Sequence, residues 1–194
     1  LGFVITFVFK LITARYFGPE SFGLFNLSES IFGLLLVIAN AGIFEGITRY
    51  IPDYRLSKKE ALLGGYLRFI FFVPLIFSLV LGGLLFFLAP QITNFFAFPP
   101  VFIVLLKYVA ISLPFGVVYH LFQTIFLSEK KIFPNKFSIN VFHKLVLLIG
   151  ILLIFIFGLS IKDLLFFFFL IYLLVTIFDL VFLIKIQFPL IIKP

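Results

Sequence analysis

The chain has 194 residues, of which 63% are hydrophobic and only 12% are charged, and its mean hydropathy is +1.30. A soluble domain carries about 25% charged residues, so this composition excludes a soluble globular protein and indicates an integral membrane protein. The net charge of +7 does not indicate a nucleic-acid partner, because the charged residues lie mostly in short connections between apolar segments.

Six segments are apolar and long enough to span a bilayer, which takes about 20 helical residues. The first opens at Leu1 without a Met, so we expect it to be truncated. The connections leave no room for a soluble domain, and we expect an all-α, polytopic transmembrane helix bundle, with residues 1–194 as a single transmembrane domain. Pro74 and Pro114 lie inside two of the spans and predict kinks there. The predicted spans are residues 1–14, 22–46, 62–89, 101–127, 137–158 and 163–185.

Lysine and arginine residues are concentrated in alternate connections. The loops at 49–59 and 129–136 are basic, and the tail after the last span is basic too. The opposite connections hold Arg15 and Lys162. Basic loops stay on the cytoplasmic side, so we expect a multi-pass protein of the cell membrane with its N-terminus and residue 194 in the cytoplasm.

The second predicted span carries polar residues that an ordinary membrane helix avoids. Asn26, Glu29 and Asn40 fall on one stripe at about 100° per residue. Because a charged group in hydrocarbon costs about 3 kcal/mol, such residues face a partner or a water-filled cavity. We expect this stripe to line a cavity. Lys10, near the outer end of the first span, either snorkels to the membrane surface or faces the same cavity.

Glu45 and Arg49 follow this stripe at the predicted cytoplasmic end of the span. They are four residues apart, a spacing at which two side chains can pair on a helix. Two interpretations stay open, an interfacial ion pair that ends the helix and a pair of charged groups at a ligand site.

Polar residues also share faces of the fourth and sixth spans. Tyr119 and Gln123 lie on one stripe of the fourth span, with His120 beside it. They either hydrogen-bond to neighbouring helices, at about 1 kcal/mol or less per contact, or line a pathway. In the sixth span, Thr176 and Asp179 share a face, and Asp179 is close enough to the cytoplasmic end to reach interfacial water.

No enzyme motif is found in the sequence, neither a phosphate-binding glycine loop nor the H-E-x-x-H or G-x-S-x-G patterns. The chain has no Cys and only two His, which do not make a metal site. We therefore expect a protein that is not an enzyme, with no catalytic residue, no metal and no cofactor.

Short motifs run through the first two spans: ARYFGPE at 14–20, FGLF at 22–25, NAGI at 40–43 and TRYI at 48–51. This pattern resembles the N-terminal region of polysaccharide biosynthesis proteins, the oligosaccharide-lipid flippases of the multidrug/oligosaccharidyl-lipid/polysaccharide exporter superfamily. The resemblance implies two six-helix lobes around a central cavity. This chain would supply the N-terminal lobe, and a missing C-terminal helix lobe would be its partner.

The resemblance also implies the substrate, an oligosaccharide carried on a polyprenyl-phosphate-type lipid within the lipid bilayer. Cationic residues would hold the phosphate groups by charge-assisted hydrogen bonds, Arg49 first and then Lys10 and Arg15. Sugar hydroxyls would contact Asn26, Asn40, Tyr119 and Gln123, and an ion gradient would act on Glu29, Glu45 or Asp179. The predicted substrate-binding set is Arg49, Lys10, Arg15, Asn26, Glu29, Asn40, Glu45, Tyr119 and Gln123, and the predicted ion-coupling set is Glu29 and Asp179.

Three alternatives stay open from the sequence. A drug or cation antiporter of the same superfamily would place carboxylates such as Glu29 and Asp179 in its cavity. A membrane-embedded glycosyltransferase would need a large acidic catalytic loop, which the short connections disfavour. A non-transporting membrane subunit would bury its polar residues against one another.

Overall fold

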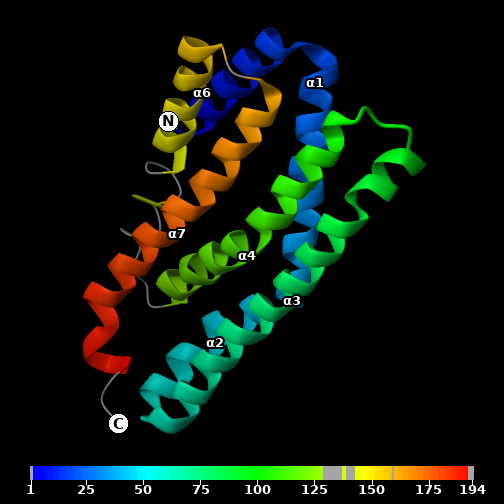
Figure 1. Ribbon diagram of the computed structural model, residues 1–194. Helices are drawn as coiled ribbons and strands as arrows, with labels where there is room; N and C mark the ends of the chain where they lie inside the picture. The colour runs from blue at the N-terminus through cyan, green and yellow to red at the C-terminus, as the bar shows by residue number, and fades with distance from the viewer. Residues whose placement is uncertain (1, 129–136, 139–142, 159, 192–194) are drawn as a thin grey trace.

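The computed structural model describes residues 2–128, 137–138, 143–158 and 160–191. The described residues form an all-α bundle without strands, which confirms the expected fold class (Figure 1). The helices are α1 (Gly2–Asn40), α2 (Ile43–Leu56), α3 (Glu60–Phe95), α4 (Val101–Ser128), α6 (His143–Phe157) and α7 (Ile161–Ile191).

Helix α1 consists of two helical parts that meet at Gly18. This residue has φ 80° and ψ 165°, a conformation far from helical that glycine adopts without steric cost. Pro19 begins the second part, where its fixed φ suits the first turn of a helix. The two parts fold back on each other as a hairpin (Figure 1). They correspond to the first two predicted spans.

The second predicted span, residues 22–46, is too long at its C-terminal end. The chain leaves α1 at Asn40, and Ala41 and Gly42 both have positive φ, of 44° and 73°. A separate helix, α2, then runs from Ile43 to Leu56. The loop predicted at 49–59 is therefore helical over most of its length.

Helix α4 lies at the centre of the bundle and packs against α1, α2, α3 and α7. It coincides with the predicted span 101–127, and its path bends near its middle (Figure 1). Pro114 lies in the middle of this helix by residue number. Proline removes a backbone donor and displaces the carbonyl four residues earlier, which explains the bend. Pro74 lies inside α3, which continues through it as one helix and extends past both ends of the predicted span 62–89.

Local signals explain the ends of the last two helices. Gly158, with φ 62°, follows α6 as a left-handed cap. At the start of α7, the Asp163 carboxylate accepts hydrogen bonds from the Ser160 backbone N–H and hydroxyl, both at 2.8 Å, as in a capping box. The predicted spans 137–158 and 163–185 match these helices, although residues 139–142 and the predicted loop 129–136 lie outside the described residues.

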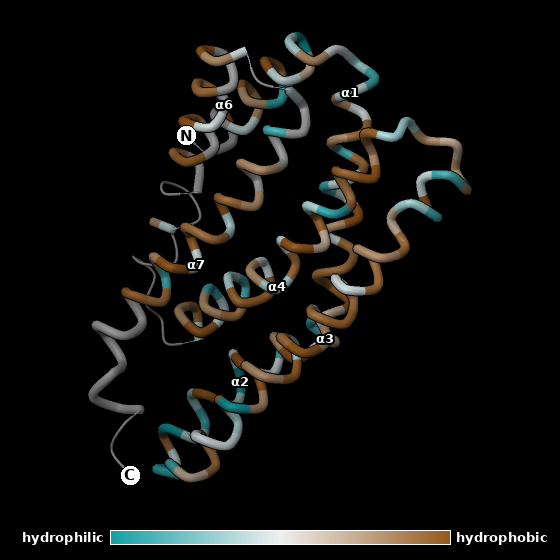
Figure 2. The backbone as a smooth tube through the Cα atoms, in the orientation of Figure 1, coloured by the Kyte–Doolittle hydropathy of each residue, from teal (hydrophilic) through white to brown (hydrophobic). Residues whose placement is uncertain are grey.

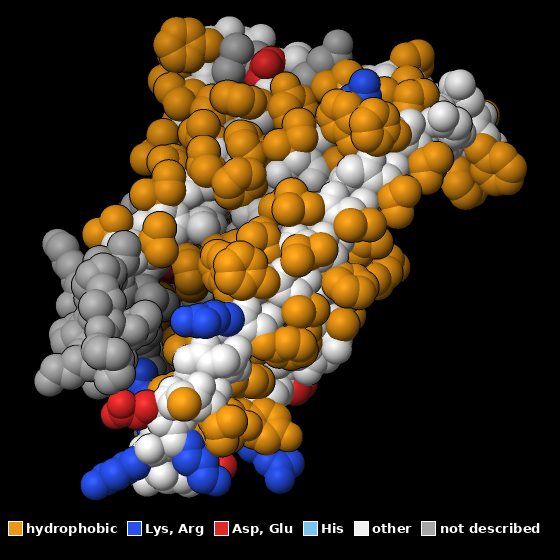
Figure 3. Space-filling model, turned by 60° about the horizontal axis from the view of Figure 1, so that its bottom comes forward, with side chains coloured by type: hydrophobic (Ala, Val, Ile, Leu, Met, Phe, Trp, Pro, Cys, Tyr) orange, Lys and Arg blue, Asp and Glu red, His pale blue; other side chains and the backbone are white. Residues whose placement is uncertain are grey.

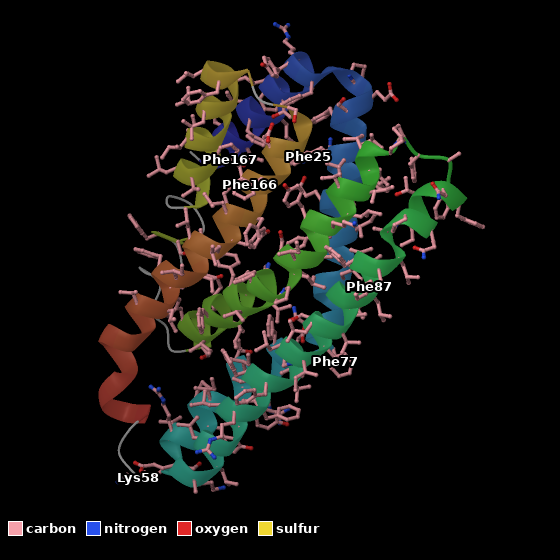
Figure 4. All side chains as sticks on the ribbon, in the orientation of Figure 1. Phe25, Lys58, Phe77, Phe87, Phe166 and Phe167 are labelled. Atoms are coloured by element: carbon pink, nitrogen blue, oxygen red, sulfur yellow. The ribbon has the colours of Figure 1, made fainter. Side chains whose placement is uncertain are left out.

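Three segments of the described helices are long and apolar enough to cross a bilayer. By length and composition, the segments Thr6–Asn40, Glu60–Phe95 and Val101–Ser128 could each cross a membrane, and Phe169–Val181 is a shorter apolar segment. Hydrophobic residues dominate every long helix, and hydrophilic ones gather at the α2–α3 end (Figure 2). Phe77 and Phe87 are exposed along the outer side of α3, whereas Phe25 is buried in the core (Figure 4). Such an apolar exterior suits contact with lipid.

Candidate functional site

An ion pair joins the two parts of α1. Lys10 Nζ lies 3.7 Å from Glu29 Oε2, and the two side chains are 46% and 42% exposed. The pair forms because the Gly18 corner folds the first part of the helix back along the second. Glu29 was predicted to line a cavity, and Lys10 either to snorkel to the membrane surface or to face that cavity. The structure brings the two side chains together at the surface of the hairpin.

Aromatic rings continue from this hairpin into the bundle. The Phe32 ring on α1 lies 4.9 Å from that of Tyr172 on α7, and the Tyr172 ring lies 5.8 Å from that of Tyr119 on α4. Glu29 is close enough to Tyr172 to interact with it electrostatically. The ring of His120 follows at 5.3 Å from Tyr119. This row connects the Lys10–Glu29 pair with the interface between α4 and α7.

A buried polar cluster lies in that interface, formed by Gln123, Ser138 and Asp179. Gln123 Nε2 donates to Asp179 Oδ2 at 2.6 Å and to Ser138 Oγ at 3.0 Å. Ser138 Oγ in turn donates to Asp179 Oδ2 at 3.2 Å. One turn along α7, Thr176 Oγ1 donates to the Phe115 carbonyl at 3.2 Å. These bonds tie the second half of α4 to α7.

The cluster differs from the expectations for its members. Asp179 was expected to be able to reach interfacial water, and this was wrong, since the residue is 0% exposed. Tyr119 and Gln123, predicted to contact sugar hydroxyls, are both buried, at 6% exposure. Ser138 was missed, because a single serine in an apolar segment carries no signal of its own.

The α2–α3 end holds a cluster of three tyrosines. The rings of Tyr50 and Tyr54 on α2 and Tyr66 on α3 lie 5.6–5.9 Å from one another. Gly46 makes room for the Tyr66 hydroxyl, which would lie 2.9 Å from a Cβ at this position. The tyrosine cluster was not predicted, although the i, i+4 spacing of Tyr50 and Tyr54 is a signal that could have found half of it.

Arg49 lies beside the tyrosine cluster. Its guanidinium carbon is 5.8 Å from the centre of the Tyr50 ring, which is within cation–π range. Within the described part of the chain, no ion pair joins Arg49 to Glu45, so the i, i+4 pairing considered from the sequence is not formed. Both residues are exposed. Basic side chains gather at this end of the molecule (Figure 3), and those on α2 and the following turn are Arg49, Arg55, Lys58 and Lys59.

The remaining predicted residues are separate from these groups. Arg15 is exposed close to the Gly18 corner. Asn26 Nδ2 donates to the Phe22 carbonyl at 2.8 Å within α1. Asn40 ends α1, and its buried Oδ1 has no hydrogen-bond partner. The described residues contain no group of three or more His, Cys, Asp or Glu that could hold a metal ion.

Comparison with known families gives one match. The family model described as "Polysaccharide biosynthesis protein" covers residues 1–194. The curated proteins and the solved structures give no match. The match covers the whole sequence and agrees with the motifs around Gly18 and Arg49, and the apolar helices make this a membrane protein. The chain belongs to the polysaccharide biosynthesis protein family.

Proposed function

We propose that this chain is a helical lobe of a flippase that moves a lipid-linked oligosaccharide across the cell membrane. Its family and its apolar helices support a membrane role in polysaccharide synthesis. The substrate has an anionic, polar head group that hydrocarbon excludes, so it needs a protein-lined path. We place residues 49–59, the N-terminus and residue 194 on the cytoplasmic side, because basic segments are retained there.

The proposal depends most on Arg49. It is exposed, lies at the basic end of the bundle, and is held over Tyr50 rather than paired with Glu45. A guanidinium group forms bidentate, charge-assisted bonds with phosphate. We propose that Arg49 receives the phosphate groups of the lipid carrier and that the neighbouring tyrosines stack against its sugars.

Lys10 and Arg15 take second place as phosphate ligands. Glu29 already offsets the charge of Lys10 at 3.7 Å, and Arg15 lies far along α1 from Arg49. Asn26 and Asn40 stay proposed contacts of sugar hydroxyls. We further propose that a second helical lobe completes the cavity and that the chain transports its substrate without acting as an enzyme.

The cation-antiporter alternative receives less support from the side chains. It requires a carboxylate open to a cationic substrate. Glu29 is paired with Lys10, and Asp179 is fully buried. We therefore favour the lipid-linked oligosaccharide as the substrate.

The test is translocation of lipid-linked oligosaccharide into proteoliposomes that contain the full natural protein. Loss of a charged hydrogen bond costs about 1.5–3 kcal/mol, so Arg49→Gln should slow translocation by roughly 10- to 100-fold. Arg49→Lys keeps the charge but loses the bidentate geometry and should be intermediate. Arg68→Gln, at another exposed arginine on α3, is the matched control. Normal translocation by a well-expressed Arg49→Gln protein would eliminate the proposal.

A further inference from the structure

Asp179 combines complete burial with incomplete hydrogen bonding. Its side chain is 0% exposed between α4 and α7. Oδ2 accepts hydrogen bonds from Gln123 and Ser138, whereas the buried Oδ1 has no partner. A buried polar atom without a partner is rare and costly, so this oxygen is where a further ligand can bind.

Among the side chains that the structure describes, no Lys, Arg or His lies within ion-pairing distance of Asp179 to balance its charge. Of the titratable groups that the structure describes, Tyr119 on α4 is close enough to Asp179 to interact with it electrostatically, and Tyr172 of α7 interacts in turn with Tyr119 and with Glu29 of α1. Val146 of α6 packs against the buried cluster of Tyr119, Ile171 and Val175. Holding a carboxylate in its charged form in such surroundings costs several kcal/mol.

A proton fits the vacant oxygen better than a metal cation does. The Gln123 amide presents its N–H groups to the carboxylate, and N–H groups repel a cation. A sodium ion also needs several oxygen ligands, and the described residues contain no group of three or more His, Cys, Asp or Glu that could hold a metal ion. A proton needs only the lone pair of Oδ1, and on binding it cancels the charge.

We propose that Asp179 is a proton-binding site that couples proton movement to the packing of α4 on α7. Oδ1 holds the proton while the two helices are packed as observed, and gives it to water when they separate. The second half of α4 is the moving part, because it bends away at Pro114 and is tied to α7 by Gln123 and Thr176. The idea that this site drives transport rests on the proposed flippase function.

The experiment measures the proton directly, by labelling with dicyclohexylcarbodiimide. This apolar reagent reacts with a protonated carboxyl: the acid proton moves to a reagent nitrogen, the carboxyl oxygen bonds to the central carbon, and the adduct rearranges to a stable acylurea with nothing leaving. Labelled peptides of the purified protein in lipid nanodiscs are quantified by mass spectrometry. As the pH rises, labelling of Asp179 should fall by up to about tenfold per unit of pH, as for one titrating carboxyl.

Two variants separate a proton site from a structural contact. Gln123→Leu removes a donor that stabilises the ionised carboxylate, so labelling of Asp179 should persist to higher pH. If the Gln123–Asp179 contact only held the helices together, Gln123→Leu would lower the stability of the protein and leave the pH dependence of Asp179 labelling unchanged. Asp179→Asn should abolish the label, and Asp163, capped at the start of α7, gives the background.

Labelling of Asp179 that does not change with pH would overturn the proposal. Protection by sodium but not potassium at constant pH would also overturn it, in favour of a cation site. These results are independent of the translocation assay. A titrating Asp179 in a protein that moves no lipid-linked oligosaccharide would refute the flippase and leave the proton site standing.

Discussion

Gly82 of α3 lies directly against the backbone of Ala110 in α4, and a Cβ at Gly82 would be 2.7 Å from the Ala110 carbonyl oxygen. That carbonyl is the one that Pro114, four residues later, leaves without its helical donor. The missing side chain at Gly82 therefore lets one helix approach the exposed backbone of the next. Weak Cα–H···O contacts recur where helices pack as closely as this.

Replacing Gly82 should separate α3 from α4. Gly82→Ala places a methyl group against backbone, which cannot move aside, and overpacking of this kind costs about 1–3 kcal/mol. The melting temperature of the protein in detergent should fall. A Cβ at the neighbouring Gly83 would have nothing within 4 Å, so Gly83→Ala is the matched control and should stabilise slightly, because Ala favours a helix over Gly. Equal melting temperatures for the two variants would contradict this packing.

Phe32 fills the space that Gly116 leaves on α4. A Cβ at Gly116 would meet the Phe32 ring at 2.5 Å and Leu36 at 3.2 Å. Gly116→Ala should therefore destabilise the protein, and Phe32→Leu should partly rescue it by removing the end of the ring. The coupling between such touching residues is about 0.5–3 kcal/mol, measurable in a double-mutant cycle of thermal or denaturant unfolding. Purely additive effects would show that the two residues do not share this space.

The Lys10–Glu29 pair should contribute little to stability. Both side chains are about half exposed, and exposed ion pairs are worth about 0.2–1 kcal/mol. Glu29→Gln and Lys10→Gln should each lower the free energy of unfolding by no more than this. A loss of several kcal/mol from either change would mean that hydrocarbon, not water, surrounds the pair. The exchanged variant, Lys10→Glu with Glu29→Lys, should unfold like the original protein.

The break between α1 and α2 depends on Gly42. Its φ of 73° is costly for residues with a side chain, by roughly 1–2 kcal/mol, and least so for Asn. Gly42→Ala should lower the melting temperature, and Gly42→Asn should lower it less. Gly64, helical and open around its Cβ, is the control, since Ala there should stabilise. If Gly42→Ala were neutral, α1 and α2 could join into one helix without cost.

The spans could be predicted because hydrophobic length is a local property of the sequence. The break at Ala41–Gly42 could not, because Ile43 and Phe44 continue the apolar pattern on its far side. The polar residues were found one helix at a time, since each stands out against its own span. The contact of Gln123 with Asp179 depends on the bend of α4 and on its packing against α7, and no periodicity within either helix contains that information.

The length of α3 makes its tilt depend on the thickness of the membrane. Its 36 residues rise about 54 Å, against roughly 30 Å of hydrocarbon and 40–45 Å with the headgroups. A tilt of about 35° would shorten its projection to the full bilayer thickness, within the observed range for membrane helices. A mismatch between the apolar part of this helix and the hydrocarbon thickness can be relieved by a change of tilt. Bilayers of different thickness should therefore change the angle of α3, and with it the depth of the tyrosine cluster at the membrane surface.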